Sequence, residues 1–251
     1  MATVLRIQTD ERFASSLSYL RKRIKTFVDL GIIDAVFSPT HLSITVSSID
    51  YEEVLFVLRD AIAEIVVTDC KIFYLLEKMK IPIADELGKR AFVRALGCFD
   101  YNTDKLIVSG LLELTPVFLL HSFYDFCLDT LKRRWSEICV LANENVCLLL
   151  KTSGFNELLR YLVSNIESRI DEVFIVGSGK EIEILDRKMK PIQSVYVNSS
   201  MSSGVQVIEK LVTLAPRRIF LCGVDQVFAR KVKEIFVTCE EIPQLDVRFK
   251  L

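Results

Sequence analysis

The chain has 251 residues, a formal net charge of −1 and apolar side chains at 51% of its positions. This length holds one large domain or about two or three small ones, and the near-zero charge gives no overall attraction to nucleic acid or to an anionic membrane. The most apolar window, residues 106–120, is interrupted by Glu113 and Pro116 and is too short to cross a bilayer.

Two further features concern the compartment in which the protein works. Residues 1–12, MATVLRIQTDER, lack the apolar core of a secretion signal. The seven cysteines are odd in number and scattered through apolar helical patterns, which is typical of reduced core residues rather than of a disulfide framework. We therefore expect a cytoplasmic protein without membrane contact.

The first segment, residues 1–80, has the pattern of a small α/β unit. Apolar and polar side chains alternate over residues 41–46, which indicates a half-exposed strand. Elsewhere the apolar residues recur at helical spacing. The predicted elements are a strand at 3–8, a helix at 13–27, strands at 35–37 and 41–46, and a helix at 54–65.

The middle segment, residues 81–168, is predicted to be helical. Strand signals largely vanish here, and helical apolar patterns continue from Leu87 to Leu162. Gly97 and Pro116 interrupt them, because glycine weakens a helix and proline lacks the N–H that a helix needs.

The last segment, residues 169–251, returns to alternating strands and helices. Ile219 to Cys222 is a continuous apolar run, which is typical of a strand covered on both faces. Leu211 and Phe220 are predicted core residues. The predicted elements are a hairpin around 177–180, a helix at 203–215, a strand at 219–222, a helix following Asp225, and an alternating strand at 245–251.

Together these patterns predict an α/β (α+β) fold. It consists of an N-terminal α/β unit (1–80), a central helical region (81–168) and a C-terminal β-hairpin plus αβαβ unit (169–251). The three parts form either separate domains or one composite domain.

The second half resembles a known family. The segments FNELLRYLVSNIESRIDEVFIV (155–176), LDRKMKPI (185–192) and VIEKLVTLAPRRIFLCG (207–223) look like the C-terminal half of the YtxC-like sporulation proteins. The likeness is specific over about residues 155–222 and extends in layout over 1–240. It implies a setting in endospore-forming bacteria, but it implies no mechanism, since the family has no established biochemical activity.

The central helices depart from the family pattern. The resemblance leads us to expect a segment of the form Phe-x-Arg-Phe-Arg-Leu, where this chain has SFYDFCLDTL. Phe123, Phe126 and Leu128 are retained, but Tyr124 and Cys127 stand where basic residues are expected. A family role that depends on those positive charges is therefore not expected here.

Two motifs bear on cofactor or metal chemistry. Gly177-Ser178-Gly179-Lys180 follows an apolar strand, but Glu181 stands where a phosphate-binding loop needs a hydroxyl, and a strand follows instead of a helix. We interpret it as a hairpin turn. His121 and Cys127 lie on one helical stretch without the close cysteine pair of a zinc site, and core packing is the favoured interpretation. We expect no cofactor and no metal.

Basic residues supply the candidate binding surface. A charged run on a helix is most often a solvated face. If the clusters met in space, they would follow a nucleic-acid backbone, with the tryptophan stacking on a base. The candidate residues are Lys132, Arg133, Arg134, Trp135, Arg217 and Arg218.

Three hypotheses for function follow. The first is a non-enzymatic cytoplasmic protein that acts in sporulation through contacts with protein partners, which rests on the family resemblance and on the weakness of the catalytic motifs. The second is a nucleic-acid-binding module that uses the basic clusters. The third is an enzyme of unrecognised type, which predicts a deep pocket with perturbed titratable groups.

Overall fold

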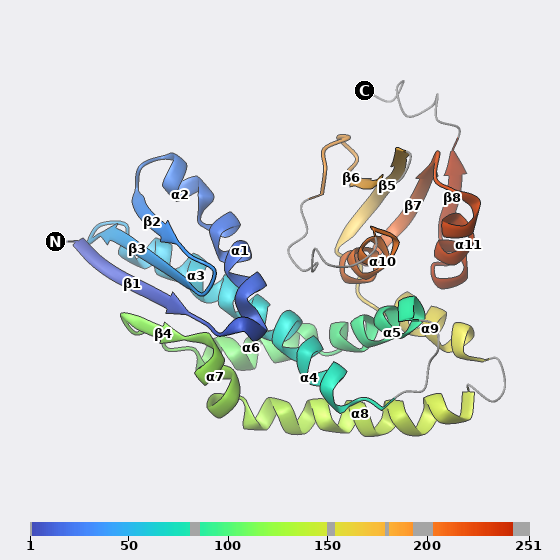
Figure 1. The fold of residues 1–251 in the computed structure, drawn as a ribbon, viewed down its shortest axis with the longest axis horizontal. Coiled ribbons are helices and arrows are strands. Elements are labelled where there is room, and N and C mark those ends of the chain that lie inside the picture. Colours follow the sequence, from blue (N-terminus) through green and yellow to red (C-terminus); the bar gives the residue numbers. More distant parts are fainter. Residues whose placement is uncertain (1, 81–85, 150–153, 179–180, 193–202, 243–251) are drawn as a thin grey trace. The chain divides into compact units, whose positions relative to one another are not determined.

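The computed structural model describes residues 2–80, 86–149, 154–178, 181–192 and 203–242. By its internal contacts the chain divides into two compact units (Figure 1). The N-terminal unit comprises Met1–Lys78 and Asp100–Glu137, and the C-terminal unit comprises Met79–Phe99 and Ile138–Leu251. The chain therefore passes from one unit to the other three times. The helices of the predicted middle region are shared between the units.

Each unit contains a four-stranded sheet together with helices, which confirms the predicted α/β (α+β) class. In the N-terminal unit the strand order is β2-β3-β1-β4, and the pairs are antiparallel except for β1 with β4. The strands are β1 (Ala2–Gln8), β2 (Ile33–Phe37), β3 (His41–Ser47) and β4 (Val117–Leu119).

Strand β4 lies in the region where the sequence predicted helices. Pro116 precedes it and cannot donate the N–H that a continuing helix requires. Its carbonyl oxygen instead accepts a hydrogen bond from the Arg6 N–H at 2.8 Å, which brings the following residues into register beside β1. The middle region is therefore helical with one short strand among its described residues.

The helices of the N-terminal unit include a π-helical turn, η2, between α3 and α4. Such turns shift the residues that follow them around the helix axis, and they often occur at functional sites. The helical elements are η1 (Glu11–Phe13), α1 (Ala14–Arg23), α2 (Lys25–Asp29), α3 (Tyr51–Ile65), η2 (Val66–Cys70), α4 (Lys71–Lys78), α6 (Tyr101–Leu111), α7 (Leu120–Cys127) and the first part of α8 (Asp129–Leu149).

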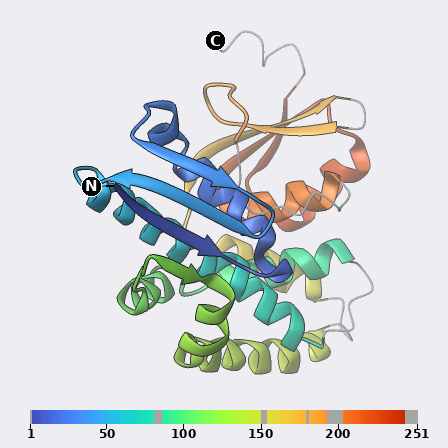
Figure 2. The same cartoon turned by 60° about the vertical axis from the view of Figure 1, so that its left-hand side comes forward.

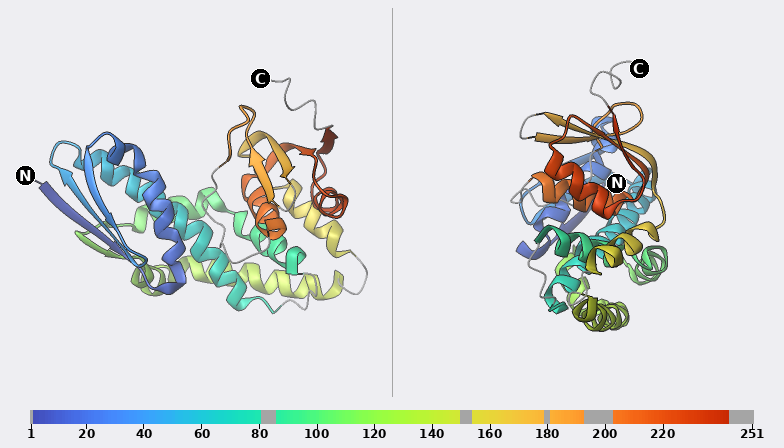
Figure 3. Two further views of the ribbon diagram at one scale, coloured as in Figure 1. Left: turned by 45° about the horizontal axis from the view of Figure 1, so that its top comes forward. Right: turned by 90° about the vertical axis from the view of Figure 1, so that its right-hand side faces the viewer.

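One face of the N-terminal sheet packs against α1 and α3 (Figures 2 and 3). On β3 the side chains of Leu42, Ile44 and Val46 are buried on this face, while the residues between them are half-buried. This alternation gave the sequence its strand signal. Val4 and Val36 are exposed on the opposite face.

In the C-terminal unit the strand order is β6-β5-β7-β8. The pairs β5–β7 and β7–β8 are parallel, and β5–β6 is antiparallel. The elements are α5 (Glu86–Cys98), the second part of α8, α9 (Phe155–Ser164), β5 (Ile170–Ser178), β6 (Glu181–Leu185), α10 (Ser203–Leu214), β7 (Pro216–Cys222), α11 (Gln226–Ile235) and β8 (Cys239–Ile242).

This unit is layered. The sheet lies against α10 and α11, and α5 and α9 follow beneath them (Figure 3, right). Leu211 is fully buried and Phe220 is 7% exposed, which confirms both as core residues. On the second face of the sheet Phe174 stacks on Phe220 with ring centroids 4.9 Å apart, and Met189 packs against them.

Two boundaries in this unit follow directly from the local sequence. The carboxylate of Asp225 accepts a hydrogen bond from the Phe228 N–H at 2.9 Å and caps α11, as predicted. Strand β8 ends the described chain, whereas the strand predicted at 245–251 lies outside the described residues. Within the part of the chain that is described, the helices are too short or too polar to span a bilayer.

Candidate functional site

A buried polar centre joins three helical elements of the N-terminal unit. Lys71, at the start of α4, is fully buried, and its Nζ lies 2.8 Å from Oδ2 of Asp104 on α6. Trp135 Nε1, from α8, donates to the same oxygen at 2.9 Å. Arg134 Nη1 lies 3.5 Å from the other carboxylate oxygen. One carboxylate therefore neutralises and positions groups from two other helices.

This centre corrects the prediction for Trp135. Its side chain is fully buried, and its ring also packs against Tyr74 with centroids 5.8 Å apart. Because the indole is part of the core, it offers no exposed face on which a base could stack. Trp135 is therefore not a surface binding residue in this structure.

The other members of that basic run occupy different environments. Lys132 Nζ lies 4.3 Å from the centroid of the Tyr124 ring and donates to the backbone oxygen of Asp125 at 3.1 Å. Arg134 also pairs with Asp100 at 3.2 Å. Arg133 is exposed. Two of the three cations are thus held by neighbours within the unit.

A charged and aromatic corner lies beside this run. Both carboxylate oxygens of Asp125 accept hydrogen bonds from the guanidinium group of Arg12, at 2.9 and 2.7 Å. These bonds hold the pKa of the Asp125 carboxyl below its ordinary value. Arg12 also lies over the rings of Phe13 and Tyr124, and burial raises the pKa of the Tyr124 hydroxyl. The corner fixes η1 against α7.

A four-membered charge network lies elsewhere in the same unit. Arg23 pairs with Asp60 and Glu64 at 2.7 and 2.9 Å, and Lys105 contacts the same two carboxylates at 2.7 and 3.2 Å. Burial is the largest single influence on the pKa of Asp60 and would raise it, but the hydrogen bonds and positive charges of Lys105 and Arg23 together lower that pKa. The two positive and two negative charges neutralise each other. Because the four side chains come from α1, α3 and α6, the network joins these three helices.

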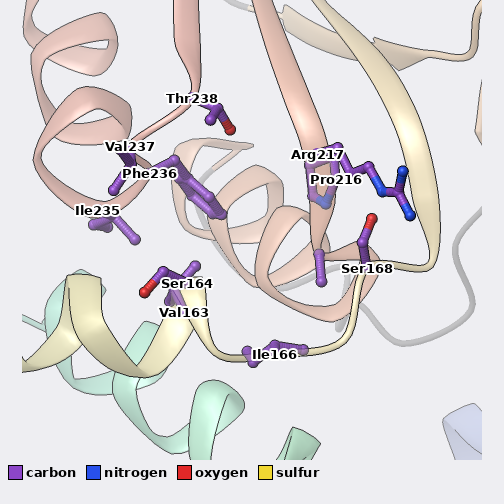
Figure 4. Close-up of a pocket in the computed structure, with 11 residues that line it drawn as sticks. Val163, Ser164, Ile166, Ser168, Pro216, Arg217, Ile235, Phe236, Val237 and Thr238 are labelled. Atoms are coloured by element: carbon purple, nitrogen blue, oxygen red, sulfur yellow. The ribbon is translucent and has the colours of Figure 1, made fainter.

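A small pocket opens in the C-terminal unit (Figure 4). It has a volume of about 230 Å³ and lies where α9 and α11 end and where β7 begins. Its apolar lining consists of Val163, Ile166, Ala215, Pro216, Ile235, Phe236 and Val237. Its polar lining consists of Ser164, Ser168, Arg217 and Thr238.

The local sequence builds this pocket by ending α10 abruptly. Ala215 has φ +42°, a left-handed backbone conformation that stops the helix. Pro216 then begins β7, because it cannot continue a helix. Ala215, which follows the end of α10, and Pro216, which begins β7, both line the pocket.

Arg217 places a positive charge beside this pocket. Figure 4 shows Arg217 and Phe236 on opposite sides of it, with the guanidinium group directed toward β5. Its Nε lies 3.6 Å from a carboxylate oxygen of Asp171, and the two side chains are 72% and 82% exposed. Arg218 pairs with Glu172 and lies over the Phe220 ring. Of the predicted residues, Arg217 and Arg218 thus belong to the C-terminal unit and residues 132–135 to the N-terminal unit.

A more open and more polar cleft lies along α11. It has a volume of about 470 Å³. Arg160 donates to the backbone oxygens of Lys233 and Glu234 there, at 3.0 and 3.2 Å, and Lys233 pairs with Glu241 at 2.5 Å. Most of its charged groups are therefore already engaged with one another.

A protein-family model matches residues 112–242, just over half of the chain. The chain belongs to the YtxC-like family. This confirms the resemblance found in the sequence. No curated protein and no solved structure matches the chain significantly.

The matched region contains the pocket of this YtxC-like protein in full, from Val163 to Thr238. It also contains α7, where the family pattern led us to expect basic residues. Tyr124 is buried in an aromatic cluster with Phe13 and Phe73. The buried residues of α7 are Leu120, Phe123 and Tyr124. Cys127 ends the same helix and is exposed, so the expected core packing is wrong for that residue.

Neither the pocket nor the polar centre of this YtxC-like protein was predicted from its sequence. Lys71 and Asp69 are charged residues within the apolar run VVTDCKIF, and that interruption was an available signal. The pocket left a weaker signal, since its lining comes from three separate segments. Only the α/β topology, which brings helix ends and strand starts to one edge, could have connected them. In the described residues, no three His, Cys, Asp or Glu side chains gather into a metal site.

Proposed function

We propose that this YtxC-like protein acts in sporulation as a non-enzymatic, cytoplasmic component that works through contacts with protein partners. Family membership supports the setting, and the pocket of the C-terminal unit supports the mode of action. The pocket is where a side chain of the partner docks.

The observation that carries this proposal is the size and lining of the pocket. Its volume of about 230 Å³ is below the range of roughly 300–1,000 Å³ that is usual for small-molecule sites. It suits a single large side chain, and protein interfaces are commonly anchored by one side chain in a well-packed pocket. Phe236 and Val163 provide buried apolar walls for such an anchor.

The chemistry of the lining supports a binding role over a catalytic one. General acid–base catalysis needs positioned titratable groups. Among the described residues that line the pocket, Arg217 carries the charge, and the polar remainder consists of the Ser164, Ser168 and Thr238 hydroxyls. A guanidinium group has five N–H donors and no acceptor, so it is suited to binding an anion.

The test uses a pocket-filling variant and a matched control. Val237 lines the pocket and is 66% exposed, whereas Val227 is 72% exposed in the same unit and does not line it. Tagged wild type, Val237→Trp and Val227→Trp are used as baits in sporulating cells, with and without nuclease. We expect a nuclease-resistant protein partner with wild type and Val227→Trp, and its loss with Val237→Trp.

Two results would contradict the proposal. If all three baits capture the protein partner equally, the pocket is not part of the interface. Partners that disappear on nuclease treatment would favour the nucleic-acid hypothesis and its exposed cations, such as Arg133. Sporulation is scored in parallel in a deletion strain that carries each variant, and normal sporulation of the uncomplemented deletion strain would exclude a required role.

A further inference from the structure

The charge beside the pocket indicates the chemistry of the partner. Arg217 is the charged residue among the described residues that line the pocket. It pairs with Asp171, and both side chains of this pair are exposed to solvent. Exposed ion pairs are weak and exchange partners readily. A carboxylate that arrives with a partner can therefore replace Asp171 at a small cost in free energy.

The C-terminal ends of the helices around the pocket repel an anion only weakly. The C-terminal end of a helix carries roughly half a negative charge on its unpaired carbonyl groups, which would favour a cation. Here those carbonyls already accept hydrogen bonds. The oxygen of Leu214 accepts from the Arg169 N–H at 3.3 Å, and that of Tyr161 accepts from Ser164 Oγ and Asn165 Nδ2 at 2.9 and 2.8 Å.

The end of α11 is capped in the same way. Arg160 donates to the backbone oxygens of Lys233 and Glu234 in the last turn of this helix. Hydrogen-bond donors therefore bind backbone carbonyl groups at the C-terminal ends of α9, α10 and α11, the three helices that end at the pocket. The full charge of Arg217 then determines which partner charge is favoured.

We propose that the pocket binds an apolar side chain that is followed by an acidic residue in an exposed segment of the partner protein. The apolar side chain enters between Phe236 and Pro216, and the carboxylate pairs with Arg217 in place of Asp171. This inference rests on the docking function proposed above and specifies its partner.

The experiment measures peptide binding to the full chain. The probes are three blocked tetrapeptides: acetyl-Gly-Leu-Glu-Gly-amide, the same peptide with glutamine for glutamate, and the same peptide with alanine for leucine. Binding is followed by amide chemical shifts in NMR titrations at low and high salt. We expect the first peptide to bind tightest and to weaken with salt.

The variants assign the binding to the pocket. Arg217→Gln should weaken the first peptide by roughly two- to fivefold, the factor that an exposed ion pair contributes, and should leave the glutamine peptide unchanged. Arg187→Gln is the control, because Arg187 is 86% exposed in the same unit and does not line the pocket. Val237→Trp should abolish binding of all peptides that bind the wild type, whereas Val227→Trp should not.

The outcomes separate this inference from the proposed function. Equal binding of the glutamate and glutamine peptides, or no binding of any peptide, would overturn the acidic partner. If the pull-down still depends on Val237, protein docking stands and only the partner chemistry is wrong. If neither experiment distinguishes Val237→Trp from Val227→Trp, both proposals fail.

Discussion

The two units are built around sheets of the same size, but they are stabilised in different ways. The N-terminal sheet is mostly antiparallel and has one face against helices, and a buried ion pair, Lys71–Asp104, lies among the helices of that unit. The C-terminal sheet is mostly parallel, and β7 buries four consecutive apolar residues, Ile219–Cys222. A buried ion pair thus distinguishes the first unit, whereas a continuous apolar strand distinguishes the second.

This difference predicts where each unit is most sensitive. A buried ion pair is costly to break, since the remaining charge keeps no partner in a medium of low polarity. An apolar layer loses stability in proportion to the volume removed. The chain has one tryptophan, Trp135, and it lies in the N-terminal unit. Its fluorescence therefore reports on that unit, while circular dichroism reports on both.

The largest effect is expected for Asp104→Asn. The asparagine keeps an acceptor for Trp135 but leaves the Lys71 ammonium without its counter-charge, so the unfolding free energy should fall by about 3–5 kcal/mol. Urea titration followed by Trp135 fluorescence measures it. Asp125→Asn is the control in the same unit, because its partly exposed pair with Arg12 should contribute less than about 1 kcal/mol. A loss for Asp104→Asn as small as that of the control would show that the centre is not charged.

In the C-terminal unit, Leu211→Ala should cost about 2–5 kcal/mol, because a fully buried side chain leaves a cavity. Circular dichroism during urea unfolding detects the loss. The matched substitution is Leu141→Ala, at a position that is 60% exposed in the same unit. If Leu211→Ala costs no more than Leu141→Ala, the assignment of Leu211 to the core is wrong.

Two glycines provide a comparison in which opposite signs are expected. A Cβ at Gly177 would lie 2.5 Å from the Gly223 oxygen and 2.9 Å from the Val224 Cα, so the backbone must move. Gly177→Ala should therefore destabilise the protein by about 1–3 kcal/mol. A Cβ at Gly110, on α6, meets nothing within 4 Å, and Gly110→Ala should stabilise by about 0.5–1 kcal/mol. Urea titrations measure the unfolding free energy of both variants relative to wild type. Changes of the same sign in the two variants would contradict this prediction.

The smallest effect concerns pH and the corner formed by Arg12 and Asp125. The pKa of Asp125 is lowered in the folded state, so the pair stabilises the protein above the unfolded value near pH 4 and this contribution is lost as pH falls through the folded pKa. Both side chains are about one-third exposed, which limits the effect to less than about 1 kcal/mol. Unfolding free energies at about pH 7 and about pH 3 should differ more for wild type than for Asp125→Asn. Equal differences would show that the pair does not stabilise the folded state.

The sequence predicted the elements whose patterns are local. Leu42, Ile44 and Val46 alternate with polar residues, and Ile219–Cys222 is continuously apolar, so each strand could be recognised from its own residues. Asp225 and Pro216 likewise indicate helix boundaries by their own chemistry. Strand β4 was missed, since three residues contain too little periodicity and the strand is defined by its pairing with β1.

The candidate site was less predictable for the same reason. Arg217 was identified from the sequence because charge is visible there, but its place beside a pocket depends on Val163 and Phe236, which come from distant segments. Trp135 was misassigned, because the run of cations before it suggested an exposed face. Its burial depends on Asp104, a partner separated from it by 31 residues along the chain.

The three passages between units also constrain how the protein folds during its synthesis. Arg12 is made 113 residues before Asp125, and Lys71 is made 33 residues before Asp104. At a synthesis rate of about 5–20 residues per second, Asp125 is made roughly 6–23 seconds after Arg12. Helix α5 is likewise made before α9 and α10, against which it packs. A nascent chain that ends before Glu137 therefore has neither unit complete, and no single cut in the chain separates the two units from each other.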